Sequence, residues 1–273
     1  MNHRLQIRII LPLFLFNLLI SGCAGVHVFN STNTPCLTNA GQGNLNIYPG
    51  RDHVEVQVAV SPAKHFGFFA NAYESFLLGK DPSYDSRGTC FLEGAVGYYS
   101  SLNKSNEESR WFYDLYAGFG NGQRVYNGSS AFLAEDDYTV YTSYDKGFIQ
   151  GSLFYIHNRS QLAFGFQPSL LYYNVMSTQV LGLRGNSIPN GGNTWTQNRF
   201  TVFNANLSVT YKLRIVPSLS FISQFAMDLS SFQVPNYPQV PSGYSGGVMG
   251  GYRNLPYNGR PVGINCGIQF TFQ

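Results

Sequence analysis

The sequence predicts an all-β protein, an antiparallel transmembrane β-barrel of about ten strands. Only 11% of its 273 residues are charged, against about 25% in typical soluble domains, whereas aromatic residues reach 16%. After the first 20 residues no apolar run approaches the roughly 20 residues of a membrane helix. Apolar and polar residues instead alternate along many segments, which is typical of strands with two different faces. These features exclude a disordered chain and a multi-helix membrane protein. The net charge of +3, without a Lys/Arg cluster, gives no sign of a nucleic-acid partner.

The N-terminus has the features of a bacterial lipoprotein signal. Arg4 and Arg8 flank the start of an apolar stretch, Ile9 to Ile20, which is long enough for a signal peptide and too short to span a bilayer. The stretch ends in ISGC, and this tetrapeptide resembles the lipobox of bacterial lipoproteins. The resemblance implies cleavage before Cys23 and a lipid anchor, with palmitate among its acyl chains, on the Cys23 thiol. The alternative is a chance cysteine behind an ordinary signal peptide.

The chain is therefore expected to divide into three parts. Residues 1–22 are a lipoprotein signal peptide, residues 23–42 a lipidated linker, and residues 43–273 the barrel. Residues 24–28 contain no acidic residue, which favours an anchor in the inner leaflet of the outer membrane, facing the periplasm. Three further cysteines (Cys36, Cys90 and Cys266) leave at least one thiol unpaired, and their pairing stays open. No Cys/His spacing indicates a metal, and no cofactor is expected.

The segment from His53 to Ser61 shows the alternation most clearly. Its valines fall on one face, while Glu55, Gln57 and Ala59 fall on the other. In a membrane barrel the valines contact lipid and the other face lines the interior; in a soluble sandwich the valines form the core. Most predicted strands reach the 9–11 residues of a tilted membrane strand. The ten predicted strands are 45–48, 53–61, 66–76, 90–100, 111–125, 147–157, 162–176, 200–214, 215–229 and 262–272.

The connections support the membrane barrel. With both termini in the periplasm, the short periplasmic turns centre on 62–65, 101–110, 158–161 and 214. The outer loops cover 49–52, 78–88, 127–145, 177–198 and 230–261. Apart from the first, each outer loop is longer than its inner neighbours, as in outer-membrane barrels. A strand number of eight is the alternative to ten.

The last strand, VGINCGIQFTFQ, carries a second signal. Asn265, Gly267, Phe270 and Phe272 fit the pattern polar-x-Gly-x-x-aromatic-x-aromatic. This resembles the C-terminal insertion signal of bacterial outer-membrane β-barrels, and the resemblance implies recognition by the barrel assembly machinery. Gly267 permits close backbone approach, and the two aromatics are expected in the interface girdle. Gln273 departs from the usual pattern, which ends on the aromatic residue.

A wider resemblance covers about a quarter of the mature chain. HVEVQVAVSPAKHFGFFANAYESF, EGAVGYYS and YDKGFIQGSLFY are similar to segments of small outer-membrane barrels with lipobox signal peptides found in Bacteroidota. That group is largely uncharacterised. The resemblance therefore implies an address in the outer membrane and no particular activity.

Two sets of residues invite a catalytic interpretation. His157 and Ser160 would be the base and nucleophile of a hydrolase such as an outer-membrane phospholipase, but no orienting acid is near in sequence. Glu135 to Asp137 lie in an outer loop and would need His53 beside them to form a protease-like rim site. Both sets are more simply a strand end and a solvated acidic tip. No catalytic residue is therefore predicted.

Other residues have structural explanations. Asp81 and Asp85 are expected to form turns rather than to bind calcium. The pairs Phe68-Phe69, Tyr98-Tyr99 and Tyr172-Tyr173 are expected to supply the interface girdle and to fill the lumen. Glycan or protein binding by exposed tyrosines is the alternative. Ten strands enclose a narrow interior, so a wide diffusion pore is not expected.

The predicted function is a non-enzymatic outer-membrane lipoprotein, a structural or accessory component of an envelope complex with its outer loops as contact surface. Its expected partners are outer-membrane lipids, the barrel assembly machinery during insertion and an envelope protein complex, with no nucleic acid. Two alternatives stay open. One is an outer-membrane hydrolase of protease or lipase type with a rim active site, and the other is a soluble periplasmic β lipoprotein.

Overall fold

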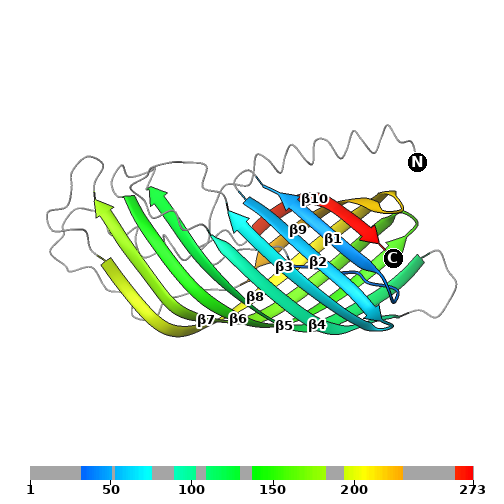
Figure 1. Cartoon of the computed structure of the whole chain (residues 1–273), viewed down its shortest axis with the longest axis horizontal. Helices are drawn as coiled ribbons and strands as arrows, with labels where there is room; N and C mark the ends of the chain where they lie inside the picture. The colour runs from blue at the N-terminus through cyan, green and yellow to red at the C-terminus, as the bar shows by residue number, and fades with distance from the viewer. Residues whose placement is uncertain are drawn as a thin grey trace.

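The protein is a closed antiparallel barrel of ten strands (Figure 1). The computed structural model describes residues 32–50, 53–75, 89–102, 109–129, 137–182, 194–229 and 262–272. Each strand pairs with its neighbours in the sequence, and β1 pairs with β10 to close the barrel. The strands are β1 (Gly43–Pro49), β2 (His53–Ala63), β3 (Phe66–Ser75), β4 (Cys90–Ser101), β5 (Ser109–Ser129), β6 (Asp137–His157), β7 (Ser160–Gly182), β8 (Thr194–Val216), β9 (Leu219–Asp228) and β10 (Val262–Phe272).

The predicted strand number and antiparallel order are confirmed. The barrel end at which β1 begins and β10 ends is called the near end, and it also holds the short connections 64–65, 158–159 and 217–218. The opposite end is called the far end. No helix among the described residues is long and apolar enough to cross a membrane.

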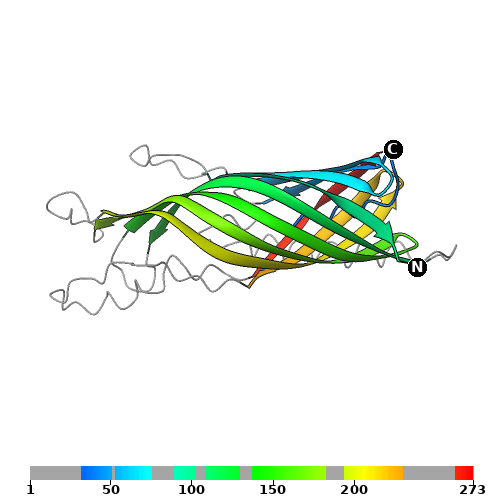
Figure 2. The same ribbon diagram turned by 90° about the horizontal axis from the view of Figure 1, so that it is seen from below.

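The predicted boundaries of the middle strands are wrong. Strands β5 to β8 have 21 to 23 residues each and extend past the other strands at the far end (Figure 2). The expected outer loop 127–145 is largely strand, because β5 and β6 pair as far as Ser129 and Asp137. Residues 137–145 are rich in Thr and Tyr, which favour strands, but contain few aliphatic residues. The stretch therefore lacks the apolar alternation by which the other strands were predicted. The turn expected at 214 lies at 217–218.

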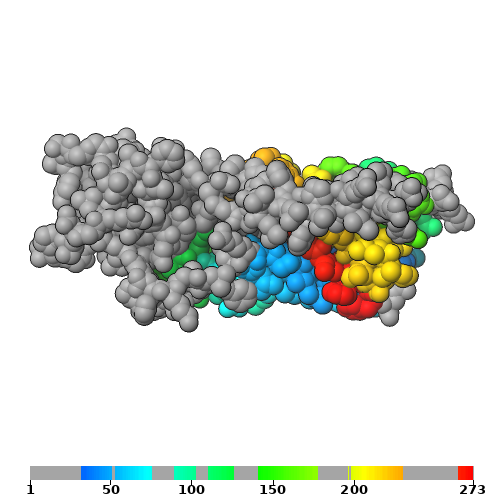
Figure 3. All heavy atoms as spheres, turned by 90° about the horizontal axis from the view of Figure 1, so that it is seen from above, coloured from blue at the N-terminus to red at the C-terminus, as the bar shows by residue number. Residues whose placement is uncertain are grey.

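The barrel wall has apolar residues outside and polar residues inside. On β2, Val58 and Val60 are each 37% exposed, whereas Glu55 and Gln57 are 1% exposed and face the lumen. The same polarity holds around the barrel, where large apolar side chains such as Leu115, Ile149 and Phe203 are exposed. This inverts the arrangement of a soluble sandwich and is the surface of an outer-membrane β-barrel. Figure 3 shows the wall from outside, with β10 in red between the blue first strands and the yellow strands of the C-terminal half.

The three aromatic pairs divide between the two faces. Phe68, Tyr98 and Tyr172 are exposed on the outside, and their neighbours Phe69, Tyr99 and Tyr173 are buried inside. Other aromatic rings contact one another on the outer face of the near end, such as those of Trp111 and Tyr155, whose centroids are 4.9 Å apart. These positions fit the predicted girdle and the predicted filling of the lumen.

The closing seam explains the glycine of the C-terminal motif. A Cβ atom on Gly267 would collide with the carbonyl oxygen of Ile47 and would lie 2.9 Å from Tyr48 Cδ1. Phe270 and Phe272 are exposed on the outer face near the end of β10. Gly267 is therefore required by the β1–β10 contact, whereas recognition of the motif by assembly machinery stays a prediction.

Candidate functional site: the filled lumen

The chain that precedes β1 lies inside the barrel. Thr32, Asn33, Thr34, Cys36 and Leu37 are at most 3% exposed, and Pro35 between them is also buried. Residues 32–37 are called the lumenal segment below. These residues belong to the predicted linker of residues 23–42, because a short stretch of this kind carries no sign in the sequence that distant strands will bury it.

A tight turn brings the lumenal segment in through the near end. The Gln42 side-chain oxygen accepts hydrogen bonds from the backbone N–H and the hydroxyl of Thr38, at 2.8 and 3.0 Å. Gly41, with a φ of 81°, donates its backbone N–H to Ser61 at the end of β2. Only a residue that tolerates a left-handed backbone fits this position. The turn therefore ties the base of the lumenal segment to the near end of the wall.

Side chains of the wall satisfy the backbone of the lumenal segment. Because it pairs with no strand, its buried carbonyl groups need other hydrogen-bond donors. Four consecutive carbonyl oxygens have such donors on four different strands. Thr32 accepts from Gln224 Nε2 at 2.6 Å, Asn33 from Gln150 Nε2, Thr34 from Lys212 Nζ at 3.1 Å and Pro35 from Asn44 Nδ2 at 2.8 Å.

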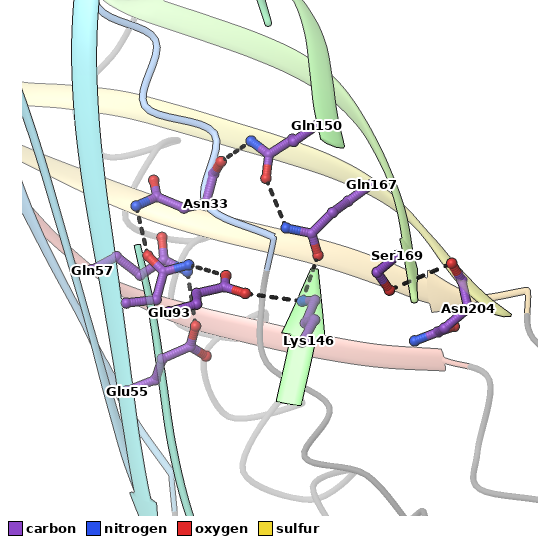
Figure 4. Close-up of polar contacts among 10 residues, drawn as sticks. Asn33, Glu55, Gln57, Glu93, Lys146, Gln150, Gln167, Ser169 and Asn204 are labelled. Atoms are coloured by element: carbon purple, nitrogen blue, oxygen red, sulfur yellow. Dashed lines mark hydrogen bonds and ion pairs between the residues drawn. The ribbon is translucent and has the colours of Figure 1, made fainter. Parts of the chain in front are cut away.

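A closed ring of hydrogen bonds joins the lumenal segment to the wall (Figure 4). Its six members come from β3, β4, β6, β7 and the segment itself. In order, Asn71 Nδ2 donates to Glu93 Oε1 (2.6 Å), Lys146 Nζ to Glu93 Oε2 (2.9 Å) and to Gln167 Oε1 (2.8 Å), Gln167 Nε2 to Gln150 Oε1 (3.1 Å), Gln150 Nε2 to the Asn33 carbonyl, and Asn33 Nδ2 to Asn71 Oδ1 (2.7 Å).

The ring contains a buried ion pair. The Lys146 and Glu93 side chains are 4% and 0% exposed, and Lys146 Nζ also lies 5.3 Å from the ring centroid of Phe91 and 5.0 Å from that of Phe148. Since charges inside a protein must be paired and hydrogen-bonded, each member of this pair requires the other. The ring therefore holds the segment by a network that depends on all its members.

Below the ring, toward the near end, the contacts are apolar. Leu37 packs in a buried cluster with Phe69, Tyr99 and Tyr116. Gly67 makes room for it, because a Cβ atom there would lie 2.9 Å from Leu37 Cδ1 and 2.7 Å from the Tyr116 hydroxyl. At this level the lumen is filled by a polar layer, which contains the ring, and by an apolar layer around Leu37.

The first catalytic candidate is not assembled as a nucleophile and base. His157 and Ser160 face each other across the β6–β7 pair. The Ser160 hydroxyl, however, hydrogen-bonds the Tyr211 hydroxyl at 3.2 Å, and His157 Nε2 lies 3.1 Å from Asn158 Nδ2. The structure places these residues in a strand end, as their simpler interpretation requires.

The remaining candidates are scattered or lie outside the described residues. His53 begins β2 at the far end, where its ring stacks on Tyr73 at 5.1 Å. Asp81, Asp85, Glu135, Asp136 and the lipidation candidate Cys23 fall outside the described residues, as does the Asp137 side chain. No disulfide joins the three described cysteines, Cys36, Cys90 and Cys266. Among the described residues no group of three or more His, Cys, Asp or Glu could hold a metal ion.

Comparisons with known proteins give no sequence match and a distant structural similarity. No protein-family model matches the sequence, and no curated protein matches it. Among solved structures the chain is similar to the outer membrane protease OmpT from Escherichia coli. The two share 13% identity, the similarity covers 89% of this chain and 99% of that one, and the TM-score is 0.44. A likeness at this level carries no argument about activity.

Proposed function

We propose that this protein is a non-enzymatic outer-membrane lipoprotein, a membrane-embedded accessory component of an envelope complex that contacts its partners through the loops at the far end. The observation that carries the proposal is the filled lumen. Residues 32–37 are held in the lumen by a hydrogen-bond network of inward side chains from β1, β3, β4, β6, β7, β8 and β9. A lumen filled in this way supports a scaffold rather than a channel.

The exterior supports a place in the outer membrane. A belt of exposed apolar side chains surrounds a closed sheet with no free edge, and closed barrels of this kind are the only β-structures that span bilayers. Outer-membrane lipids are then the partners of the wall, and the near end, where β1 begins and β10 ends, faces the periplasm. The barrel assembly machinery is the proposed partner during insertion.

The lipid anchor is the part of the proposal that depends on sequence alone. The lipobox-like ISGC makes Cys23 the acceptor. The nine steps from Cys23 to Thr32 span at most about 30 Å when extended, so a lipidated Cys23 would lie within that distance of Thr32. We expect wild-type cells fed an alkyne-labelled palmitate to label the protein. Labelling of Cys23→Ala at the wild-type level would overturn the anchor.

Affinity purification tests the accessory role. The tagged protein is extracted from its native outer membrane with a mild detergent, and every co-purifying chain is identified and quantified. A stoichiometric partner that is lost when residues 230–261 are shortened supports an accessory subunit that binds through this outer loop. Shortening the near-end turn 102–108 is the matched control. A solitary barrel would contradict the proposal.

A further inference from the structure

A cavity at the near end has a strongly basic lining. Its volume is about 430 Å³, and it is lined by the base of the lumenal segment, the turn that follows it and the near ends of β1 and of β6 to β10. The charged residues that line it are Arg159, Lys212 and Arg214. The size lies within the range of small-molecule sites, and no acidic side chain is among the lining residues.

The fold brings the three cationic residues to one end of the lumen. Lys212 is 3% exposed and donates to the Thr34 carbonyl, which leaves further ammonium protons for a ligand or the neighbouring Cys36. The Arg214 backbone N–H donates to the Arg159 carbonyl oxygen at 2.8 Å, so the two arginines sit on adjacent backbone. Asp114 interacts electrostatically with Lys212 but does not line the cavity. With Asp114 included, the net charge of the site remains positive.

The lining also contains an unused hydrogen-bond donor. The Nε2 atom of Gln161 is buried and has no hydrogen-bond partner among the described residues. Buried polar groups are normally satisfied. An acceptor that enters the cavity beside Gln161 would satisfy this amide.

We propose that this cavity binds a phosphate group, carried either by a lipid headgroup at the membrane rim or by a soluble phosphorylated molecule. Guanidinium groups match phosphate oxygens in shape and charge, and charge-assisted hydrogen bonds are the stronger ones. The proposal rests on the proposed function only for the compartment, which is then the periplasm. Because the turn and Cys36 form part of the wall, a bound phosphate would also hold the base of the lumenal segment.

Calorimetry on the purified full-length barrel tests the site. Inorganic phosphate is titrated in detergent at low salt, and nanodiscs of phosphatidylcholine with and without phosphatidylglycerol are compared for thermal stabilisation of the barrel. The double variant Arg159→Gln/Arg214→Gln changes exposed side chains only, and it should bind phosphate about tenfold more weakly or worse. Lys64→Gln removes an exposed cation at the same end, outside the lining, and should bind like wild type.

The outcomes separate the sources and the proposals. Phosphate binding that the double variant loses supports a soluble ligand. Stabilisation by phosphatidylglycerol alone, lost in the same variant, supports a lipid headgroup. A wild-type barrel that responds to neither probe would overturn the site, as would equal weakening by Lys64→Gln, which would indicate net charge alone. A barrel that keeps a stoichiometric partner but ignores phosphate refutes only this site and leaves the accessory role intact.

Discussion

Two single residues, Lys146 in the lumen and Gly267 at the β1–β10 seam, are expected to matter most for the stability of the barrel. Lys146 connects the ion pair to the amide chain of the ring, and Gly267 allows the backbones of β1 and β10 to meet. Lys146 lies within a buried hydrogen-bonded ring, and Gly267 lies against the backbone of β1. Substitutions at these places should therefore have larger effects than substitutions on the outer wall.

Removing one charge of the ion pair should destabilise the barrel. Lys146→Met leaves the buried Glu93 carboxylate without its cation, and we expect a loss of about 3–5 kcal/mol of unfolding free energy. The double variant Lys146→Met/Glu93→Gln should recover part of that loss because no unpaired charge remains. Urea unfolding in detergent, followed by tryptophan fluorescence, measures both. A double variant at least as unstable as Lys146→Met would show that the pair is not the cause.

Gly267→Ala should impair closure of the barrel. The added Cβ meets a backbone carbonyl, which can move only if the β1–β10 ladder shifts, and overpacking of this kind costs about 1–3 kcal/mol. We expect a smaller folded fraction after refolding into detergent. Gly147→Ala is the matched control, because a Cβ there meets nothing within 4 Å. Equal folded fractions of the two variants would contradict the close contact.

Among the elements, the lumenal segment differs in kind from the strands. Each strand is held by backbone ladders to two neighbours, whereas residues 32–37 are held by side chains that reach in from the wall. Side-chain hydrogen bonds of this kind contribute about 0.5–1.5 kcal/mol each. The segment can therefore be altered without removing any ladder hydrogen bond.

Replacing residues 32–37 by six Gly and Ser residues should open the lumen. The Asn33 side chain that donates to Asn71 and the Leu37 side chain that packs in the buried cluster would be lost, and water would enter the space they leave. We expect the variant to conduct ions in planar bilayers more strongly than wild type. Gly–Ser replacement of Asn39 and Ala40, whose side chains are exposed in the near-end turn, controls for the change in composition. Identical conductance of wild type and the lumenal variant would contradict the filled lumen as the barrier.

At the scale of the whole molecule, closure is the defining property. Pairing of β1 with β10 removes both sheet edges, and edges are where barrels would otherwise open or aggregate. The outer apolar belt then faces only lipid or detergent. The molecule should therefore unfold as one unit, because opening the wall at any strand exposes unpaired backbone to an apolar medium.

Gel mobility should report this closure. A sample in SDS that has not been heated should migrate differently from a boiled sample, because the closed barrel keeps its compact shape until heat disrupts its ladders. The comparison is made on one preparation run side by side. Equal mobility of the two samples would argue against a detergent-resistant barrel and so against the membrane-spanning role of the wall.

The class of fold could be predicted from the sequence, because the features that specify a membrane barrel are local. Alternation on β2 placed Val58 and Gln57 on opposite faces. The strand-like segments and the short and long connections between them predicted about ten antiparallel strands and left eight open, and the structure has ten. The strand limits of β5 and β6 were missed because polar β-residues resemble a loop until a partner strand is known. What fills the barrel became known from the tertiary structure alone. Asn33 forms hydrogen bonds with Gln150 and Asn71, and Lys212 lines a cavity with Arg159 and Arg214. Strands distant in sequence bring such residues together only when the barrel closes.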